Sequence, residues 1–258
     1  MKLIFDSHAH YDDEAFDEDR AGLLQQLPQL GVCCVINVGA DLGGCAASLE
    51  LAQKYPYFYA GVGVHPECVA GLPEDYLGRV RGMAVRPKVV AIGEIGLDYH
   101  FDDMAPKEVQ RRIFEEQILL AKELELPVIV HDRDAHGDTM ELLRKHRPRG
   151  VVHCFSGSVE MMREVVSLGM YIGLGGAVTF KNARVPVEVA REVPADRLLM
   201  ETDAPYMAPV PFRGKRCDSS LIAYSAARIA EIRGVSSEEI LKTAKRNAET
   251  LFQIQLEE

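Results

Sequence analysis

The sequence predicts a (β/α)8 barrel of the TIM type, followed by an extra C-terminal helix. Short apolar runs alternate with helical patterns along the whole chain. Several of these runs are apolar without alternation, as expected for parallel strands that are buried on both faces. The chain has 258 residues, a length that such a barrel often uses as one domain. We therefore expect one domain over residues 1–258, with a doubly wound open sheet as the alternative.

The eight predicted strands are rich in Val and Ile, and turn or helical sequence separates each from the next. This spacing is typical of βα units, in which consecutive strands lie parallel. The predicted strands run over residues 3–5, 32–38, 58–64, 89–95, 128–130, 151–155, 170–174 and 198–200.

The clearest helix begins at Pro106, a favourable first helical residue, and has Glu108 in its first turn. A wide apolar stripe at helical spacing follows over residues 109–124, and Pro127 ends the pattern. An earlier helix over residues 16–30 contains Pro28, which should kink or shorten it.

The last predicted helix begins at Ser236. Glu239 follows at the spacing of a capping box, and apolar residues continue at helical spacing to Phe252. This helix comes after the eighth strand–helix unit, so we expect it to lie outside the repeating pattern of the barrel.

The composition is that of a globular protein with a sizeable core, with 47% hydrophobic and 26% charged residues. The formal net charge of -10 argues against tight wrapping of duplex DNA, which usually needs a basic surface. No apolar run approaches the ~20 residues of a membrane span, and the N-terminus turns polar too soon for a signal peptide. We expect a cytoplasmic protein whose six cysteines are reduced.

Six polar residues lie in the carboxyl-terminal part of predicted strands or just after them. The carboxyl ends of barrel strands converge at one face, where active sites lie, so residues far apart in sequence should meet there. A lone histidine at a strand end is more often structural than a ligand, but six such residues on five strands favour a functional site. The six are His8, His10, Glu94, His131, His153 and Asp203.

This set suits two divalent cations. His8 and His10 are two residues apart on an extended segment, so their side chains point the same way and can share one cation. Glu94 could bridge the two cations, while His131 and His153 hold the second. Asp203 could bind the first cation and accept a proton from the attacking water, whose pKa the metals would lower. We expect Asp203 and Glu94 to be catalytic.

Other residues near the strand ends are candidates for substrate contact or support of the site. Asp98 is a candidate for the site, whereas Asp102 and Asp103 are typical of a solvated loop. The glycine-rich segment 173–176 could cradle a phosphate or could simply turn the chain. The candidates for substrate binding are His65, Arg133, Glu201, Arg213 and Lys215.

Six ordered motifs resemble those of the TatD-like metal-dependent deoxyribonucleases, a branch of the amidohydrolase superfamily. They are DSHAH, GVHP, GEIGLDY, HDRDA, HCFSGS and ETDAPY, and with APVPFRGKR and RNAETLF the resemblance runs from Phe5 to about Phe252. It implies a TIM-type barrel that hydrolyses DNA phosphodiester bonds from the 3′ end of single strands. It also implies two metals, one on His8, His10, Glu94 and Asp203 and the other on Glu94, His131 and His153.

The chain departs from the family pattern at one place. After GKR, family members usually carry an Asn-Glu-Pro type sequence, and this chain has Cys217, Asp218 and Ser219. The six predicted metal positions are intact, so the departure bears on substrate preference and rate.

Two other functions fit the same residues. One is hydrolysis of a small ester, lactone or amide, because the site chemistry does not choose between phosphorus and carbon centres. The other is a scaffold that kept the barrel and lost turnover, which the complete ligand set argues against. Four histidines favour zinc or manganese, whereas the resemblance to nucleases favours magnesium. We expect DNA as the partner, as single strands or strand ends, with no membrane and no obligate protein partner.

Overall fold

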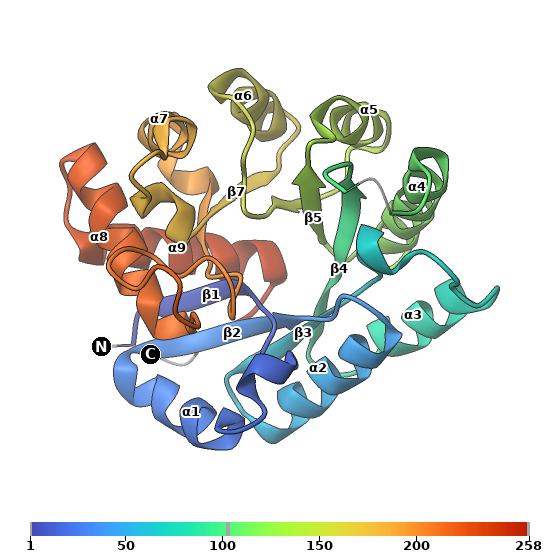
Figure 1. Cartoon of the computed structure of the whole chain (residues 1–258), viewed down its shortest axis with the longest axis horizontal. Helices are drawn as coiled ribbons and strands as arrows, with labels where there is room; N and C mark the ends of the chain where they lie inside the picture. The colour runs from blue at the N-terminus through green and yellow to red at the C-terminus, as the bar shows by residue number, and fades with distance from the viewer. Residues whose placement is uncertain (1, 102–103, 257–258) are drawn as a thin grey trace.

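The computed structural model describes residues 2–101 and 104–256, so the predicted loop residues Asp102 and Asp103 lie outside it. Eight parallel strands form one sheet in the order of the sequence, β1 to β8, with helices around it (Figure 1). An isolated bridge between Ala9 and Ala204 joins the segments that end β1 and follow β8. The sheet is thus nearly closed, which confirms the TIM-type barrel and excludes the open sheet.

The strands agree with the predicted ones in number and order, but their ends differ. β1, β4 and β5 continue past their apolar runs into the polar residues of the site, since these residues still pair with neighbouring strands. β6 ends earlier than predicted, and Cys154 just beyond it has a left-handed φ of 41°. The strands are β1 Ile4–Ala9, β2 Val32–Val38, β3 Phe58–Val62, β4 Val89–Asp98, β5 Val128–Arg133, β6 Gly150–Val152, β7 Tyr171–Leu174 and β8 Leu198–Met200.

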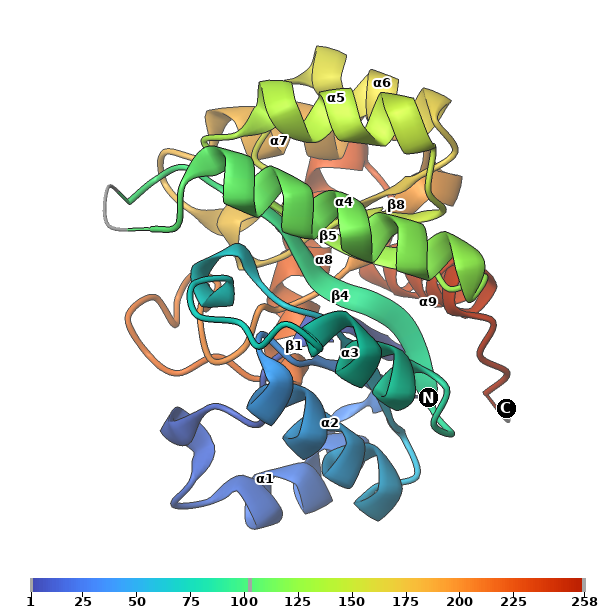
Figure 2. The ribbon, with the colours of Figure 1, turned by 90° about the vertical axis from the view of Figure 1, so that its right-hand side faces the viewer.

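The helices form the outer layer of the barrel, and α3 and α4 lie on the outside of β4 (Figure 2). α4 begins at Lys107, one residue later than predicted, and Pro106 is its N-cap residue. Pro28 shortens the first helix, because the chain continues as a 3-10 turn over Leu27–Leu30. The helices are α1 Arg20–Gln26, α2 Leu42–Lys54, α3 Tyr76–Ala84, α4 Lys107–Glu123, α5 His136–His146, α6 Val159–Ser167, α7 Arg184–Glu192, α8 Ile222–Arg233 and α9 Ser237–Phe252.

The extra C-terminal helix α9 begins as predicted, with the Ser236 hydroxyl accepting a hydrogen bond from the Glu239 N–H. It packs against β1 and β8 at the end of the barrel where the strands begin. Phe252 stacks on Phe5 of β1 with ring centroids 6.3 Å apart, within a buried cluster that includes Leu199 and Leu251. α9 therefore closes the amino-terminal end of the barrel and leaves the carboxyl-terminal end for a site.

The six cysteines are free thiols, as expected. Within residues 2–101 and 104–256, no helix has the length and apolar character needed to span a bilayer.

Candidate metal centre

The six predicted metal-binding residues lie together at the carboxyl end of the barrel. His8 is in β1 and His10 follows it, Glu94 is in β4, His131 is in β5, His153 follows β6, and Asp203 follows β8. The Asp203 N–H donates to the His8 carbonyl over 3.0 Å, which joins the two ends of the sheet beside the site. Asp203 has a left-handed φ of 62°, a conformation that is uncommon in residues other than glycine.

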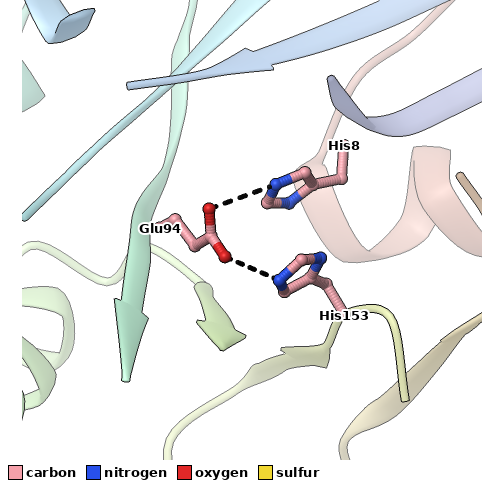
Figure 3. A group of neighbouring side chains, drawn as sticks. All are labelled: His8, Glu94 and His153. Carbon is pink, nitrogen blue, oxygen red and sulfur yellow. Dashed lines mark ion pairs between the residues drawn. The ribbon is translucent and has the colours of Figure 1, made fainter. Parts of the chain in front are cut away.

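Glu94 lies at the middle of the group, and its two oxygens face different histidines. Oε2 is 3.4 Å from Nε2 of both His8 and His10. Oε1 is 2.6 Å from His153 Nε2 and 2.9 Å from His131 Nδ1. Figure 3 shows Glu94 between His8 and His153, with one oxygen directed at each ring. One carboxylate thus divides the group into a first half, with His8, His10 and Asp203, and a second half, with His131 and His153.

The ligand atoms of the first half have the mutual spacing of ligands around one cation. The Nε2 atoms of His8 and His10 are 2.9 Å apart, and Asp203 Oδ1 is 3.7 and 3.4 Å from them. Ligands about 2.1 Å from one cation lie about 3.0 Å apart in an octahedron and about 3.4 Å apart in a tetrahedron. The first half can therefore hold a cation with little rearrangement.

The second half has similar spacing with fewer protein ligands. His131 Nδ1 and His153 Nε2 are 3.4 Å apart, and both approach Glu94 Oε1. Three protein ligands leave positions that water or substrate can fill, as in catalytic metal sites.

The electrostatics of the cluster also fit cations. Burial alone would raise the pKa of Glu94, but the neighbouring histidines, His153 first and with a hydrogen bond from His10, hold that pKa well below its usual range. Burial would lower the pKa of His10, but hydrogen bonds to Asp203 and Glu94 outweigh it and raise the pKa well above its usual value. Glu94 is therefore ionised, and its negative charge favours cations between the ligand groups.

Two of the histidines are oriented through their second ring nitrogen. Nδ1 of His10 donates to the Val38 carbonyl over 2.7 Å, which leaves Nε2 free to face the centre. Nε2 of His131 donates to Asp98 Oδ2 over 3.0 Å, which leaves Nδ1 facing Glu94. Asp98, a candidate from the sequence, therefore supports the second half by fixing the His131 ring.

His65 lies against the centre, but its hydrogen bonds distinguish it from the other histidines. Its Nδ1 accepts a hydrogen bond from the Glu67 N–H over 3.2 Å, so the neutral ring carries its proton on Nε2. That Nε2 faces Glu94 Oε1 at 3.5 Å. Burial lowers the pKa of His65 to about 3, so the ring is neutral. Although His65, Glu94 and His131 are spaced like metal ligands, this protonation favours His65 as a partner of Glu94.

Asp6 is a buried carboxylate that the sequence analysis did not identify. Its Oδ1 accepts hydrogen bonds from the N–H groups of His8 (3.2 Å) and Thr202 (3.0 Å). Its Oδ2 accepts from the hydroxyls of Thr202 (2.6 Å) and Ser219 (2.7 Å). Burial raises the pKa of Asp6 to about 6. Asp6 thus ties β1 to the segment that carries Asp203.

Ser219, in the segment that departs from the family pattern, belongs to this network. Its N–H donates to the Tyr11 hydroxyl over 2.8 Å, and that hydroxyl lies 2.8 Å from Ser219 Oγ. Both side chains are fully buried. Ser219 is therefore not exposed at the site. Its hydroxyl donates to Asp6, the carboxylate that supports the first half.

Glu201 is buried beside His153, with 1% of its surface exposed. Its Oε1 accepts a hydrogen bond from the Cys154 N–H and lies 3.8 Å from His153 Nδ1. The predicted substrate contact does not suit this burial, and the position favours a role in orienting His153. A Cβ at Gly173 would collide with this carboxylate, so the glycine makes room for the Glu201 side chain. The predicted phosphate cradle is therefore not needed to explain why glycine stands at this position.

The cationic candidates are exposed residues on β5 and on the loop after β8. Arg133 is exposed at the end of β5, with its guanidinium 5.0 Å from the Phe101 ring. Arg213 and Lys215 are exposed on the loop after β8. They border a cavity that contains none of the six ligand candidates.

Known proteins resemble this chain over nearly its whole length. The family model for TatD-related DNase matches residues 5–253. YabD of Bacillus subtilis, an uncharacterized metal-dependent hydrolase, is 41% identical over 98% of this chain and 100% of its own. The 3′-5′ ssDNA/RNA exonuclease TatD of Citrobacter koseri is 34% identical over 97% of this chain and 99% of its own.

The fold agrees equally well with a solved structure. The crystal structure of YjjV, a TatD homolog from Escherichia coli, superposes with a TM-score of 0.92. It is 35% identical and covers 98% of this chain and 99% of its own. The chain belongs to the TatD-related DNase family, and it is a metal-dependent hydrolase of the amidohydrolase superfamily.

Proposed function

We propose that this protein is a deoxyribonuclease that removes nucleotides from the 3′ end of single-stranded DNA with two divalent cations. The observation that carries the proposal is the division of Glu94, whose two oxygens face two separate histidine groups. The name of the Citrobacter koseri relative, a 3′-5′ ssDNA/RNA exonuclease, supports the substrate class and adds RNA as a second substrate to test.

In this proposal His8, His10 and Asp203 would hold one cation, His131 and His153 would hold the other, and Glu94 would contribute an oxygen to each. Two bound cations would neutralise the phosphate oxygens and acidify the attacking water. The neutral ring of His8 suits a ligand, since burial and the neighbouring His153 lower its pKa to about 4. His65 and Asp98 keep Glu94 and His131 in place.

Asp203 is the proposed proton acceptor. Its side chain is 20% exposed, whereas that of Glu94 is 5% exposed, so Asp203 is the carboxylate that a substrate can reach more easily. Burial would raise the pKa of Asp203, but the hydrogen bond to His10 and the neighbouring histidines together keep that pKa below its usual value. The ionised carboxylate can take the proton from water as the water attacks phosphorus opposite the leaving 3′ oxygen.

The test is hydrolysis of end-labelled single-stranded DNA, duplex DNA and RNA by the purified protein after loading with Mg²⁺, Mn²⁺ or Zn²⁺. We expect single nucleotides released from the 3′ end of single-stranded DNA, and loss of this activity in Asp203→Asn. Asp196→Asn is the matched control, because Asp196 precedes β8 at the opposite end of the barrel. Equal cleavage by wild type and Asp203→Asn, or faster hydrolysis of a lactone or carboxylic ester than of any nucleic acid, would contradict the proposal.

A further inference from the structure

A groove lies beside the candidate centre, between the loop after β8 and the segment after β1. It has a volume of about 550 Å³, and its walls are residues 205–208, residues 213–216, Asp13 and Ala15. Both segments follow the carboxyl ends of strands, as the centre does. Pro205 is two residues beyond Asp203, and two residues of chain span at most about 7 Å. The groove therefore begins next to the proposed proton acceptor.

The walls of the groove are held in place by contacts on several sides. The Cys217 N–H donates to the Pro205 carbonyl over 2.9 Å, which closes the base of the loop. The Val210 N–H donates to the Thr179 hydroxyl over 2.8 Å. Arg216 binds both carboxylate oxygens of Asp19, at 2.8 and 2.6 Å, and so ties the loop to the start of α1. The groove is formed before any ligand arrives, which lowers the entropy cost of binding.

The groove presents positive charge in an acidic protein. Arg213 and Lys215 are exposed, and in the described part of the chain neither has a carboxylate within ion-pair distance. The Arg213 guanidinium rests on the Phe180 ring, 3.7 Å from its centroid, which fixes the cation without neutralising it. The acid of the groove, Asp13, accepts hydrogen bonds from the Tyr206 hydroxyl and the Ala15 N–H, each over 2.8 Å.

Tyr206 adds an exposed aromatic face. It is 56% exposed, and its hydrogen bond to Asp13 fixes the ring at the wall of the groove. Cations that reach phosphates, combined with an aromatic ring that stacks a base, are the elements by which proteins hold single strands without reading their sequence.

We infer that this groove is a binding site for single-stranded polynucleotide beyond the phosphodiester that is cut. Arg213 and Lys215 bind backbone phosphates, and Tyr206 stacks on a base. The inference rests on the proposed nuclease function. It adds that substrates long enough to fill the groove bind more tightly than substrates that occupy the centre alone.

Binding can be measured without turnover, by fluorescence anisotropy of labelled dT10 in EDTA. We expect Arg213→Ala/Lys215→Ala to weaken binding about 10-fold, and to reduce the slope of log affinity against log salt by about 1.4, which corresponds to two phosphate contacts on a single strand. Arg228→Ala/Lys242→Ala removes the same charge from α8 and α9 and should leave both quantities unchanged. No binding by wild type, or equal affinity and salt slope in the groove variant, overturns the inference.

Two variants of Tyr206 test the stacking contact separately. Tyr206→Ala should weaken dT10 binding several-fold, whereas Tyr206→Phe keeps the ring and should retain most of the affinity. An equal loss in both variants would assign the effect to the hydroxyl and its bond to Asp13, and would overturn the stacking role.

Turnover separates this inference from the proposed function. With metal-loaded protein, the groove double variant should raise the KM for dT10 about 10-fold and leave hydrolysis of bis(p-nitrophenyl) phosphate within about twofold of wild type. If wild type hydrolyses neither substrate, the proposed function fails, while the binding measurement still decides the groove. If both are hydrolysed and the variant equals wild type on dT10, the groove inference fails and the nuclease proposal stands.

Discussion

The two halves of the candidate centre share Glu94 but are supported in different ways. Asp6 supports the first half with four hydrogen bonds that join β1, the segment after β8 and Ser219. Separate carboxylates support the second half: Asp98 binds His131, and Glu201 lies 3.8 Å from His153 without a hydrogen bond to it. Through Ser219, the first half is therefore hydrogen-bonded to the end of the loop that follows β8. Changes in that loop should reach one metal position and spare the other.

Removing the shared carboxylate should have the largest effect, because Glu94 is a ligand candidate in both halves. We expect Glu94→Ala to lower kcat by about 10³-fold or more, since both cations lose a ligand and the repulsion between them is no longer offset. Metal content measured after dialysis should fall below that of wild type at both positions. Glu238→Ala, an exposed residue of α9, is the control. Retention of full metal content in Glu94→Ala would show that the carboxylate does not bridge.

Asp6→Ala should affect the first half selectively. It leaves the N–H groups of His8 and Thr202 without their acceptor inside the barrel, which costs about 1–3 kcal/mol for each group. We expect the first-half cation to bind about 10- to 100-fold more weakly, because a supporting residue has been lost, with the second-half cation unchanged. Calorimetric metal titration and thermal melting would measure the two effects.

The control for Asp6→Ala is Asp6→Asn, whose amide oxygen can still accept from both N–H groups. It should recover most of the stability and part of the affinity. A uniform loss at both metal positions in Asp6→Ala would contradict the division between the halves.

Asp98→Ala is the matched change in the second half. Asp98 accepts hydrogen bonds from the His131 ring and the His100 N–H. We expect about 10-fold weaker binding of the second-half cation and a smaller loss of thermal stability than in Asp6→Ala. The same titration should leave the first-half cation unchanged, and weaker binding there would mean that the two halves are supported jointly.

Ser219→Ala should have the smallest effect. It removes one hydrogen bond from Asp6 and one from Tyr11, with a loss of about 1–2 kcal/mol in the free energy of unfolding. We expect the first-half cation to bind a few-fold more weakly and the affinity for the second-half cation to stay unchanged. Ser220→Ala, which removes a hydroxyl that donates to Asp218, is the neighbouring control. An unchanged first-half affinity in Ser219→Ala would limit the role of Ser219 to stability.

The sequence was sufficient to predict the barrel and the meeting of the six ligand candidates. Parallel strands bring their carboxyl ends to one face, so a polar residue after each apolar run is enough to place it there. The same logic does not identify Asp6, which directly follows the predicted strand over residues 3–5. In the structure, β1 continues to Ala9 and every residue in it is buried. Asp6 pairs with Thr202 and Ser219 near the other end of the chain, and no local pattern predicts hydrogen bonds over that separation.

The roles of His65 and Glu201 also depended on the structure. The sequence placed both near the site, but the hydrogen bond from the Glu67 N–H decides which nitrogen of His65 carries the proton. The burial of Glu201 decides that it lies behind His153. Such features depend on side-chain packing, which strand and helix periodicity does not describe.

The position of α9 has a consequence for how the chain is made. β1 is synthesised long before α9, so the face of Phe5 that Phe252 covers stays exposed until α9 has left the ribosome. The buried cluster at the amino-terminal end of the barrel is therefore completed only after α9 has been made. We expect ribosome-bound chains that end before Ser237 to expose this apolar surface to chaperones, and addition of α9 to be the step that covers it.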